Sequence, residues 1–387
     1  MLPTITLPKI PPRFLHGHPW LYSNEVTMDA AAKAVAPGSV VQLRDSHNRF
    51  LALAQFNPHS LIAARLLTRR EEAIDVGFWR TRLEKALALR TALFTEPYYR
   101  LAHGEADGLP GLIIDRYGDV LVLQANTAGM DAALNDLLSA LEAVLKPSAV
   151  LLRGDTHARA LEGLPQENKI LKGEIPEKTT VRENGVSYLA HLHTGQKTGW
   201  FYDQRRNRAL AAELSKSKSM LDLYSHSGGF GLPAAKAGAS KVVCVDSSGP
   251  ALALAQEAAK AANFSQISFQ EEDAFEFCAT SHDVFDVVIA DPPPFARSKK
   301  DVPTALKGYR KLARLSAARV AANGFLFIFS CSHAILRERF DEECLRGVSE
   351  AGRSAKILAR TGADFDHPQH AHLPESAYLK GLLLQLD

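Results

Sequence analysis

Apolar residues in the C-terminal half of the chain form short blocks that alternate with stretches of helical spacing. Strand-length blocks followed by amphipathic segments are typical of parallel strands joined by helices, so we expect a mostly parallel sheet with helices on both faces. The expected strands are residues 220–224, 241–245, 267–270, 284–290 and 325–330, and the expected helices are residues 250–263, 274–280 and 304–321. A helix at 336–351 and strands at 356–358 and 378–385 would complete this Rossmann-like α/β domain over residues 191–387.

The first half of the chain has different patterns. Residues 1–75 contain short strand-like runs at 40–44, 50–54 and 61–67, and a small β-barrel is the simplest way to bury them without exposed edges. In residues 76–190, some apolar segments have the spacing of strands and others that of helices, which predicts a separate α+β domain. Its expected elements are helices at 78–94 and 130–145, a hairpin of 112–115 with 120–124, and strands at 149–152 and 186–190.

Composition sets broad limits on location and chemistry. The 387 residues suggest two or three domains, and 46% hydrophobic with 23% charged residues is ordinary for a globular protein. No apolar run approaches the ~20 residues of a membrane span, and prolines interrupt the N-terminal segment where a signal peptide would be apolar. We therefore predict a cytoplasmic protein that does not bind membranes. Four cysteines without a C-x-x-C pair indicate neither a disulfide framework nor a metal site.

Positive charge is concentrated in one segment. Residues 291–319 hold eight basic and two acidic side chains, whereas the whole chain has a net charge of only +2. Clustered positive charge attracts polyanions such as RNA, although a solvated helix face is the alternative reading. The basic residues are Arg297, Lys299, Lys300, Lys307, Arg310, Lys311, Arg314 and Arg319.

Three expected strands end in residues that suggest a ligand site. The strand at 220–224 is followed by the glycine-rich loop 225–231, and Asp246 and Asp273 follow the next two strands. Ligands of open parallel sheets lie beyond the carboxyl ends of the strands, where an acidic side chain can bind ribose hydroxyls. We assign Asp246 to a ribose and Asp273 to an adenine amino group. The loop lacks the G-x-G-x-x-G pattern of dinucleotide sites. A structural turn that binds no ligand is the alternative interpretation.

Reactive side chains follow two further strands. Asp291 begins an Asp-Pro-Pro-Pro-Phe sequence, in which Phe295 is suited to stack on a nucleobase, and Cys331 follows the strand 325–330. A thiolate added to carbon 6 of a pyrimidine makes carbon 5 nucleophilic enough to accept a methyl group, while Asp291 can hold the exocyclic amine or a protonated ring nitrogen. A buried cysteine that only packs in the strand is the alternative. The residues point to methyl transfer from S-adenosylmethionine.

Several motifs, in order, resemble the ribosomal RNA large-subunit cytosine-C5 methyltransferases, a family of class I enzymes that use S-adenosylmethionine. The resemblance covers almost the whole chain. It includes His18-Pro19-Trp20, residues 105–116 and 197–205, the glycine loop, Asp291-Pro292-Pro293, Ser330-Cys331-Ser332 and Tyr378-Leu379-Lys380-Gly381. This chain departs from the family pattern directly after Asp291-Pro292-Pro293. Many relatives carry a second cysteine there, whereas this chain has Pro294. Another base or water would then remove the carbon-5 proton.

The resemblance implies a PUA-like RNA-binding barrel at 1–75, a central α+β domain at 76–190 and the methyltransferase domain at 191–387. It also implies a cytidine of 23S ribosomal RNA as substrate, with homodimerisation left open. Cys331 would be the nucleophile and Asp291 the second catalytic group. The implied cofactor residues are Lys197, Thr198, Phe201, Gln204, Tyr224, Ser225, Gly228, Gly231, Asp246, Ser247, Asp273, Ala274, Asp291 and Pro292, and the implied substrate residues are Phe295, Arg297, Lys299 and Lys300.

Two other functions fit parts of the same pattern. Methylation of a guanine or adenine nitrogen would need the Asp-Pro-Pro-x-Phe sequence but not Cys331, and relatives with that activity lack the cysteine. A non-catalytic RNA-binding protein that keeps the methyltransferase fold would not bind S-adenosylmethionine. A substitution of Cys331 and a calorimetric titration with the cofactor separate these alternatives.

Overall fold

A computed structural model describes residues 2–195, 198–296 and 298–387. The chain forms two compact units, each built from more than one segment. Unit 1 contains residues 1–177, 191–200 and 365–376, and unit 2 contains residues 178–190, 201–364 and 377–387. Three domains with boundaries at 75/76 and 190/191 were predicted, whereas this division has two units. Residues 178–190 pack in unit 2, and residues 191–200 and 365–376 pack in unit 1. No helix in the described ranges is long and apolar enough to cross a membrane.

Unit 1 begins with a five-stranded sheet of strand order β1-β3-β4-β5-β2. Leu7, Leu43 and Phe56 of this sheet pack with Phe14 of α1 in a separate hydrophobic core. The strands are β1 (Thr4–Leu7), β2 (Trp20–Leu21), β3 (Ser39–Asp45), β4 (Phe50–Phe56) and β5 (Ala64–Thr68), accompanied by the short helices α1 (Pro12–Leu15) and α2 (Ala30–Lys33).

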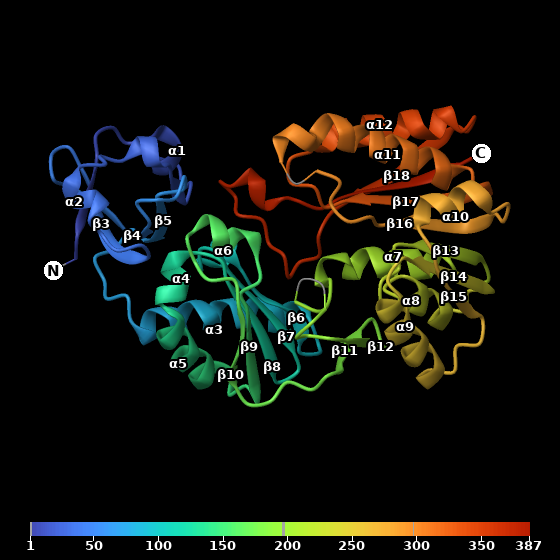
Figure 1. Cartoon of the computed structure of the whole chain (residues 1–387), viewed down its shortest axis with the longest axis horizontal. Helices are drawn as coiled ribbons and strands as arrows, with labels where there is room; N and C mark the ends of the chain where they lie inside the picture. Colours follow the sequence, from blue (N-terminus) through green and yellow to red (C-terminus); the bar gives the residue numbers. More distant parts are fainter. Residues whose placement is uncertain (1, 196–197, 297) are drawn as a thin grey trace. The chain divides into compact units, whose positions relative to one another are not determined.

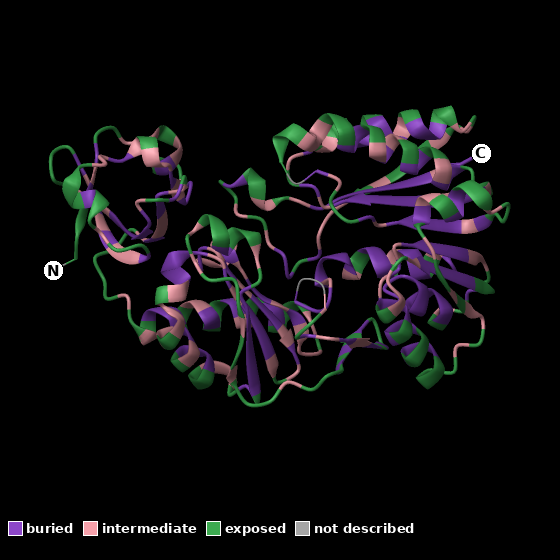
Figure 2. Cartoon of the chain, viewed as in Figure 1, coloured by how far each residue is buried: buried purple, intermediate pink, exposed green. Residues whose placement is uncertain are grey.

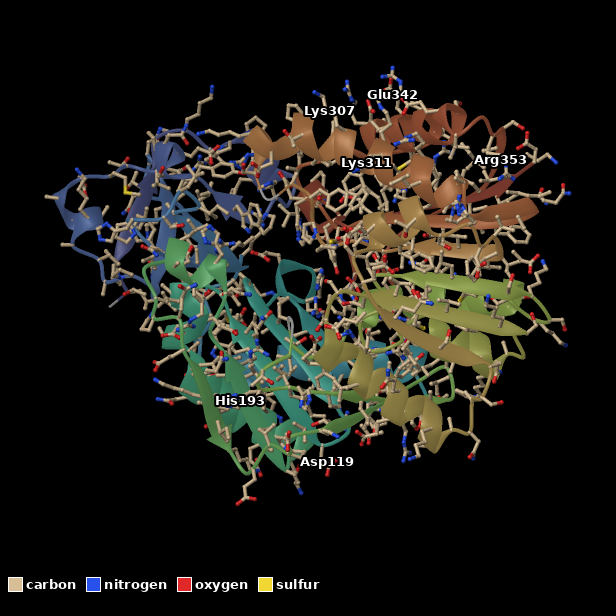
Figure 3. All side chains as sticks on the ribbon, turned by 45° about the vertical axis from the view of Figure 1, so that its right-hand side comes forward. Asp119, His193, Lys307, Lys311, Glu342 and Arg353 are labelled. Atoms are coloured by element: carbon tan, nitrogen blue, oxygen red, sulfur yellow. The ribbon has the colours of Figure 1, made fainter. Side chains whose placement is uncertain are left out.

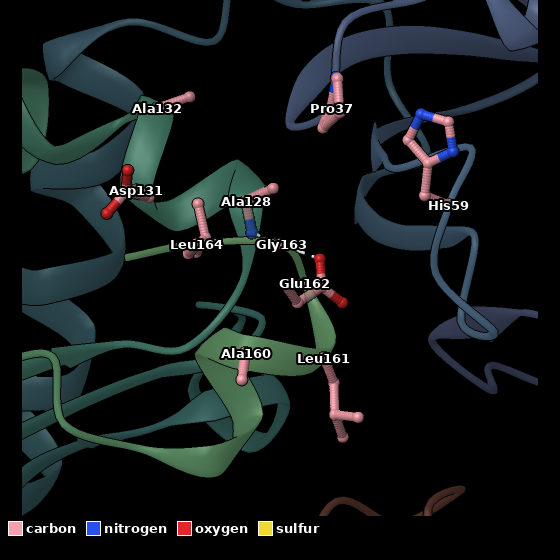
Figure 4. Close-up of a pocket in the computed structure, with 10 residues that line it drawn as sticks. All are labelled: Pro37, His59, Ala128, Asp131, Ala132, Ala160, Leu161, Glu162, Gly163 and Leu164. Carbon is pink, nitrogen blue, oxygen red and sulfur yellow. Dashed lines mark hydrogen bonds between the residues drawn. The ribbon is translucent and has the colours of Figure 1, made fainter. Parts of the chain in front are cut away.

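A second sheet in unit 1 has the order β10-β9-β8-β7-β6 and packs against α3 and α5 around its own core. Glu162 links the two sheets, because its carboxylate accepts hydrogen bonds from Asn57 and Ser60. A hollow of about 490 Å³ lies here between Pro37 and His59 on one side and Ala128 and Leu161 on the other (Figure 4). The elements are α3 (Val76–Leu93), β6 (Tyr98–His103), β7 (Leu112–Tyr117), β8 (Val120–Ala125), α4 (Ala128–Ala132), α5 (Leu134–Leu145), β9 (Ala149–Arg153), α6 (His157–Leu161) and β10 (Asn168–Lys172).

Unit 2 is built on a seven-stranded sheet of order β15-β14-β13-β16-β17-β19-β18. The first five strands are parallel, and β19 runs antiparallel to both β17 and β18. These strands are β13 (Ser219–Leu223), β14 (Lys241–Asp246), β15 (Ile267–Glu271), β16 (Phe285–Ala290), β17 (Val320–Ser330), β18 (Ala355–Thr361) and β19 (Lys380–Leu386). A separate hairpin is formed by β11 (Thr179–Glu183) and β12 (Val186–Ala190).

Helices cover both faces of this sheet (Figure 1). One core joins the sheet to α10, α11 and α12, and another joins its opposite face to α7 and α8. Most residues of β13, β14, β16 and β17 are buried, which explains their continuous apolar runs (Figure 2). The helices are α7 (Arg205–Leu214), α8 (Gly231–Lys236), α9 (Gly249–Ala261), α10 (Ala274–Thr280), α11 (Val302–Ala317) and α12 (Arg337–Glu350). The predicted Rossmann-like domain is confirmed.

Candidate active site

The glycine-rich loop after β13 has a strained backbone that two local contacts hold in place. Tyr224 and His226 adopt positive φ angles of 62° and 49°, and Gly228 has a φ of 78°. The Ser225 amide donates to the Val245 carbonyl at 3.1 Å, and the Ser225 carbonyl accepts from the amide of Gly228 at 2.9 Å. Non-glycine residues held in the left-handed region cost free energy and concentrate at ligand sites. The loop is therefore a candidate ligand cradle.

Asp246 ties this loop to the turn after β14. Its two carboxylate oxygens accept hydrogen bonds from the backbone amides of His226 and Ser248, each at 2.8 Å. Each carboxylate oxygen can accept a second bond, so a ribose hydroxyl can still donate to Asp246. Asp273 has a different local role, because its side chain accepts from the Phe275 and Glu276 amides and caps α10. Its second oxygen is the one left for an adenine amine.

Two buried polar atoms of the loop have no hydrogen-bond partner among the residues that the structure describes. They are the Tyr224 hydroxyl and Ser225 Oγ. Burial raises the pKa of Tyr224, so the phenol stays neutral and can donate as well as accept. Buried polar groups in native proteins are nearly always paired, and these two orphans fit a bound polar ligand such as the nucleoside of S-adenosylmethionine.

Gly231 is needed for packing at the start of α8. A Cβ atom there would lie 2.3 Å from Cys244 Sγ on β14. Its amide donates to Asp222 Oδ2 at 2.8 Å, and burial raises the pKa of the Asp222 carboxyl to about 7. Asp222 lies inside an apolar strand run and holds the loop, a role that our sequence analysis missed. The cofactor contact predicted for Gly231 stays a prediction.

Asp291, Pro292 and Cys331 come together at the ends of the neighbouring strands β16 and β17. The distance from Cys331 Sγ to the Pro292 carbonyl oxygen is 4.0 Å, and the Asp291 amide lies 3.5 Å from the Leu223 carbonyl of β13. Cys331 is half-buried, whereas Cys244, Cys278 and Cys344 are buried. The structure therefore brings Cys331 close to the residue that follows Asp291 and leaves one of the four thiols partly accessible.

Ser332 organises the backbone that follows Cys331. Its hydroxyl accepts from the Ala296 amide at 3.2 Å and lies 3.1 Å from the Tyr309 hydroxyl. Its carbonyl accepts from the ammonium of Lys380 at 2.9 Å. Tyr309 and Lys380 were missed from the sequence, although a lysine beside an apolar strand run is a signal that could have found the second.

The aromatic ring of Phe295 is partly committed to packing. It lies 4.6 Å from the ring of Tyr309 and 6.2 Å from that of Phe275, measured between centroids. Gly308 leaves room for it, because a Cβ atom there would lie 3.0 Å from the Phe295 ring. Stacking of Phe295 on a nucleobase stays a prediction that must use the rest of its surface.

The remaining predicted cofactor residues lie in several places. Phe201 contacts His226 of the glycine loop, with ring centroids 5.4 Å apart, and buried Gln204 accepts from the Asn207 side chain. Thr198 belongs to unit 1, where its hydroxyl donates to buried Asp115. Ser247 is exposed in the turn after Asp246, and Ala274 is buried in the first turn of α10. Lys197 and Arg297 lie outside the described residues.

Most of the basic segment forms an exposed face. Lys307 and Lys311 are exposed on α11 (Figure 3), and Arg314 continues their helical spacing. Lys299 and Lys300 are exposed just before this helix. In the part of the chain that the structure describes, none of these five cations has a carboxylate partner within 4.0 Å. Arg310 differs, because Glu343 and Glu350 neutralise it. Because these cations are not neutralised by carboxylates, the interpretation as a polyanion-binding face is favoured over that of a solvated helix face with internal ion pairs.

Family models and related sequences agree with this geometry. Residues 8–69 match a PUA-like domain, and residues 162–384 match the S-adenosylmethionine-dependent methyltransferase family. A ribosomal RNA large subunit methyltransferase I from Alteromonas mediterranea is 34% identical over 95% of both chains. One from Shewanella amazonensis is 36% identical over the same shares. This chain belongs to the ribosomal RNA large subunit methyltransferase I family. It is an enzyme, and S-adenosylmethionine is its cofactor.

Solved structures carry the same fold. A proposed S-adenosylmethionine-dependent methyltransferase from Streptococcus mutans superimposes with a TM-score of 0.82 at 21% identity, over 99% of this methyltransferase and all of that chain. A proposed methyltransferase complexed with SAH gives a TM-score of 0.84 at 22% identity, over 99% and 100% of the two chains. At such identities the likeness concerns the fold, and the site residues are assigned by the chemistry of this methyltransferase.

Proposed function

We propose that the enzyme methylates carbon 5 of a cytidine in 23S, large-subunit ribosomal RNA through a covalent adduct with Cys331. The observation that supports this chemistry is the accessible thiol beside the Asp291-Pro292 backbone, at the sheet edge that also holds the glycine loop. The relatives' name supports ribosomal RNA as the substrate. A nitrogen methyltransferase would have no use for that thiol.

In the proposed reaction, the Cys331 thiolate bonds to carbon 6 of the cytosine ring, and the ring electrons move toward carbon 5. Asp291 accepts a hydrogen bond from the exocyclic amine or from the protonated ring nitrogen, and the positive charge that it stabilises there draws electrons away from carbon 6. When bound, S-adenosylmethionine supplies the electrophilic methyl group. Loss of the carbon-5 proton to water or another base then lets the Cys331–carbon bond break and restores the thiol.

For the cofactor we propose the residues around the glycine loop. Asp246 would accept from the ribose hydroxyls, Asp273 from the adenine amine, and Tyr224 and Ser225 would use their unpartnered oxygens. Those orphaned atoms support the assignment, because a structural turn would leave them unsatisfied. The other proposed contacts are Lys197, Thr198, Phe201, Gln204, Gly228, Gly231, Ser247, Ala274, Asp291 and Pro292.

RNA recognition would combine three parts of the chain. The PUA-like domain at 1–75 would bind RNA structure, the exposed basic face would contact phosphates, and Phe295 with Arg297 would meet the target nucleotide. A central domain at 76–190 and a catalytic domain at 191–387 complete the proposed division. A cytoplasmic location follows from the substrate, and a homodimer would be tested by light scattering.

Nucleoside mass spectrometry tests the substrate and the base together. Large-subunit RNA from cells lacking the enzyme should gain one 5-methylcytidine when incubated with the enzyme and methyl-labelled S-adenosylmethionine. Small-subunit RNA serves as the matched control and should stay unlabelled. A label on a guanine or adenine nitrogen would instead establish the alternative chemistry and reject the role of Cys331.

Removing charge at Lys299 and Lys300 should weaken RNA binding and flatten its salt dependence. A contact to single-stranded RNA contributes about 0.7 to the slope of log affinity against log salt, so the double Gln variant should lose roughly 1.4 of that slope. Filter binding at several salt concentrations measures it. Substituting Lys216 and Lys260, two exposed lysines outside the segment, removes the same charge and should leave the slope unchanged. Equal slopes for both double variants would make the segment a solvated surface.

A further inference from the structure

Lys380 is an unusual residue for the interior of a sheet. It begins β19 opposite Ser330 of β17, and only 4% of its surface is exposed. Lysine ammonium groups are almost never fully buried unless they are paired with an opposite charge. Here the Nζ atom donates to the Ser332 carbonyl at 2.9 Å and to the Tyr378 carbonyl at 2.7 Å. Neither acceptor carries a full negative charge.

Within the described residues, Lys380 has no carboxylate partner, and its third ammonium proton has no acceptor. Among the groups that shift the pKa of Lys380, the Cys331 thiolate is the one of opposite charge, and it attracts the ammonium and favours its charged form. Burial and the Arg337 guanidinium act in the other direction and together lower the pKa of Lys380 to about 8. A buried ammonium group and a neighbouring thiol neutralise each other's charge only when the thiol has lost its proton.

Backbone geometry fixes this neighbourhood. Lys380 Nζ is bonded to the carbonyl of the residue after Cys331, and the Cys331 residue itself follows the Ser330–Lys380 register pair. Cys331 Sγ lies 4.0 Å from the Pro292 carbonyl oxygen, whose partial negative charge disfavours a thiolate, so a nearby cation would offset that effect. Titratable and charged groups from the other packed elements are Asp291 after β16, Tyr309 on α11, His333 after β17, Arg337 on α12 and Tyr378 before β19.

We propose that Lys380 is a positioning residue that stabilises the thiolate of Cys331 as its buried counter-charge. The proposal rests on the proposed function, because it explains how the nucleophile ionises near neutral pH. A free cysteine thiol has a pKa near ~8.5, and thiols beside lysine or arginine ionise between about 3.5 and 7.5. The same pairing gives a reason for a lysine at a position where the strand is otherwise apolar. Loss of the charge leaves a thiol that is mostly protonated at neutral pH.

The test measures ionisation of Cys331 without RNA. The rate of alkylation by iodoacetamide is followed against pH for the full-length enzyme, with the Cys331→Ser variant as the blank, since the other three cysteines are buried. In the wild type the midpoint should lie below about 7.5. In Lys380→Met it should rise by at least one pH unit, so that alkylation at a pH below both midpoints becomes roughly tenfold slower. Calorimetric binding of S-adenosylmethionine confirms that each variant is folded.

Two further variants separate charge from hydrogen bonding. Lys380→Gln keeps N–H donors for the two carbonyls but has no charge, so its midpoint should move with that of Lys380→Met. Lys380→Arg restores a cation and should recover at least part of the shift. An unchanged midpoint in folded Lys380→Met and Lys380→Gln would overturn the proposal and leave Lys380 as a structural donor. If methylation fell on a base nitrogen while the midpoints moved as expected, the proposed function would fail and the Lys380–Cys331 pairing would stand.

Discussion

Replacing Cys331 by alanine should abolish RNA methylation while S-adenosylmethionine binding stays close to that of the wild type. Among the cysteines, all of which the structure describes, Cys331 is the one with a partly exposed thiol that can form the proposed bond to carbon 6. Removing a covalent nucleophile costs about a thousandfold or more in turnover. The cofactor loop lies after β13 and has its own anchors in Val245 and Asp246, so it does not depend on the thiol. Single-turnover transfer of labelled methyl groups measures the first quantity and calorimetry the second.

A second cysteine provides the matched control for this experiment. Cys278 on α10 is 2% exposed and burial raises its pKa to about 12, so it is a packing residue. Cys278→Ala should cost stability of the order of 1 kcal/mol through the lost contacts and keep near wild-type turnover. Full activity of Cys331→Ala would contradict the covalent mechanism and favour methylation of a ring nitrogen. Loss of activity in both variants would point to unfolding, which the calorimetric titration detects.

The catalytic fold was predictable because its strands are buried on both faces. β13, β14, β16 and β17 read as continuous apolar runs, and their carboxyl ends lie together in any parallel sheet. That rule alone brought Asp246, Asp291 and Cys331 to one edge. β10 was missed because most of its residues are exposed, which leaves no apolar pattern to find. One helix was predicted over 130–145, whereas Thr127 caps a short α4 before α5 begins at Leu134.

Contacts between residues far apart in the sequence determine the features that sequence analysis did not predict. The hairpin of β11 and β12 packs in unit 2 because Glu183 pairs with buried Arg208 and the Tyr188 hydroxyl donates to the Gly229 carbonyl. The sequence of residues 178–190 alone does not identify those partners. Asp222 and Lys380 were missed for the same reason. The hydrogen-bond partners of each charged side chain come from another part of the chain and are known only from the structure. Charged residues inside or beside apolar strand runs are the signal that sequence reasoning should weigh more heavily.

Asp291→Asn should lower methyl transfer by about 10²–10⁴-fold with little effect on folding. The amide keeps the size of the side chain and leaves the backbone contact of residue 291 with Leu223 intact. It lacks the negative charge that would hold an exocyclic amine or a protonated ring nitrogen, so the ring would gain less electron withdrawal in the adduct. Cysteine addition would then become the slow step. Single-turnover kinetics with saturating RNA and cofactor measures the loss, and cofactor affinity should change only a few-fold.

Asp286, at the opposite end of the same strand, is the matched control for Asp291. Its carboxylate accepts hydrogen bonds from the Ser219 amide and hydroxyl, both at 2.8 Å, and these bonds lower its pKa. Asp286→Asn should therefore lower the urea midpoint of unfolding yet leave turnover near that of the wild type, because the amino end of β16 faces no ligand. Equal turnover for both variants and the wild type would remove Asp291 from the chemistry. A loss confined to Asp291→Asn places the charge at the ring, next to the sulfur that attacks it.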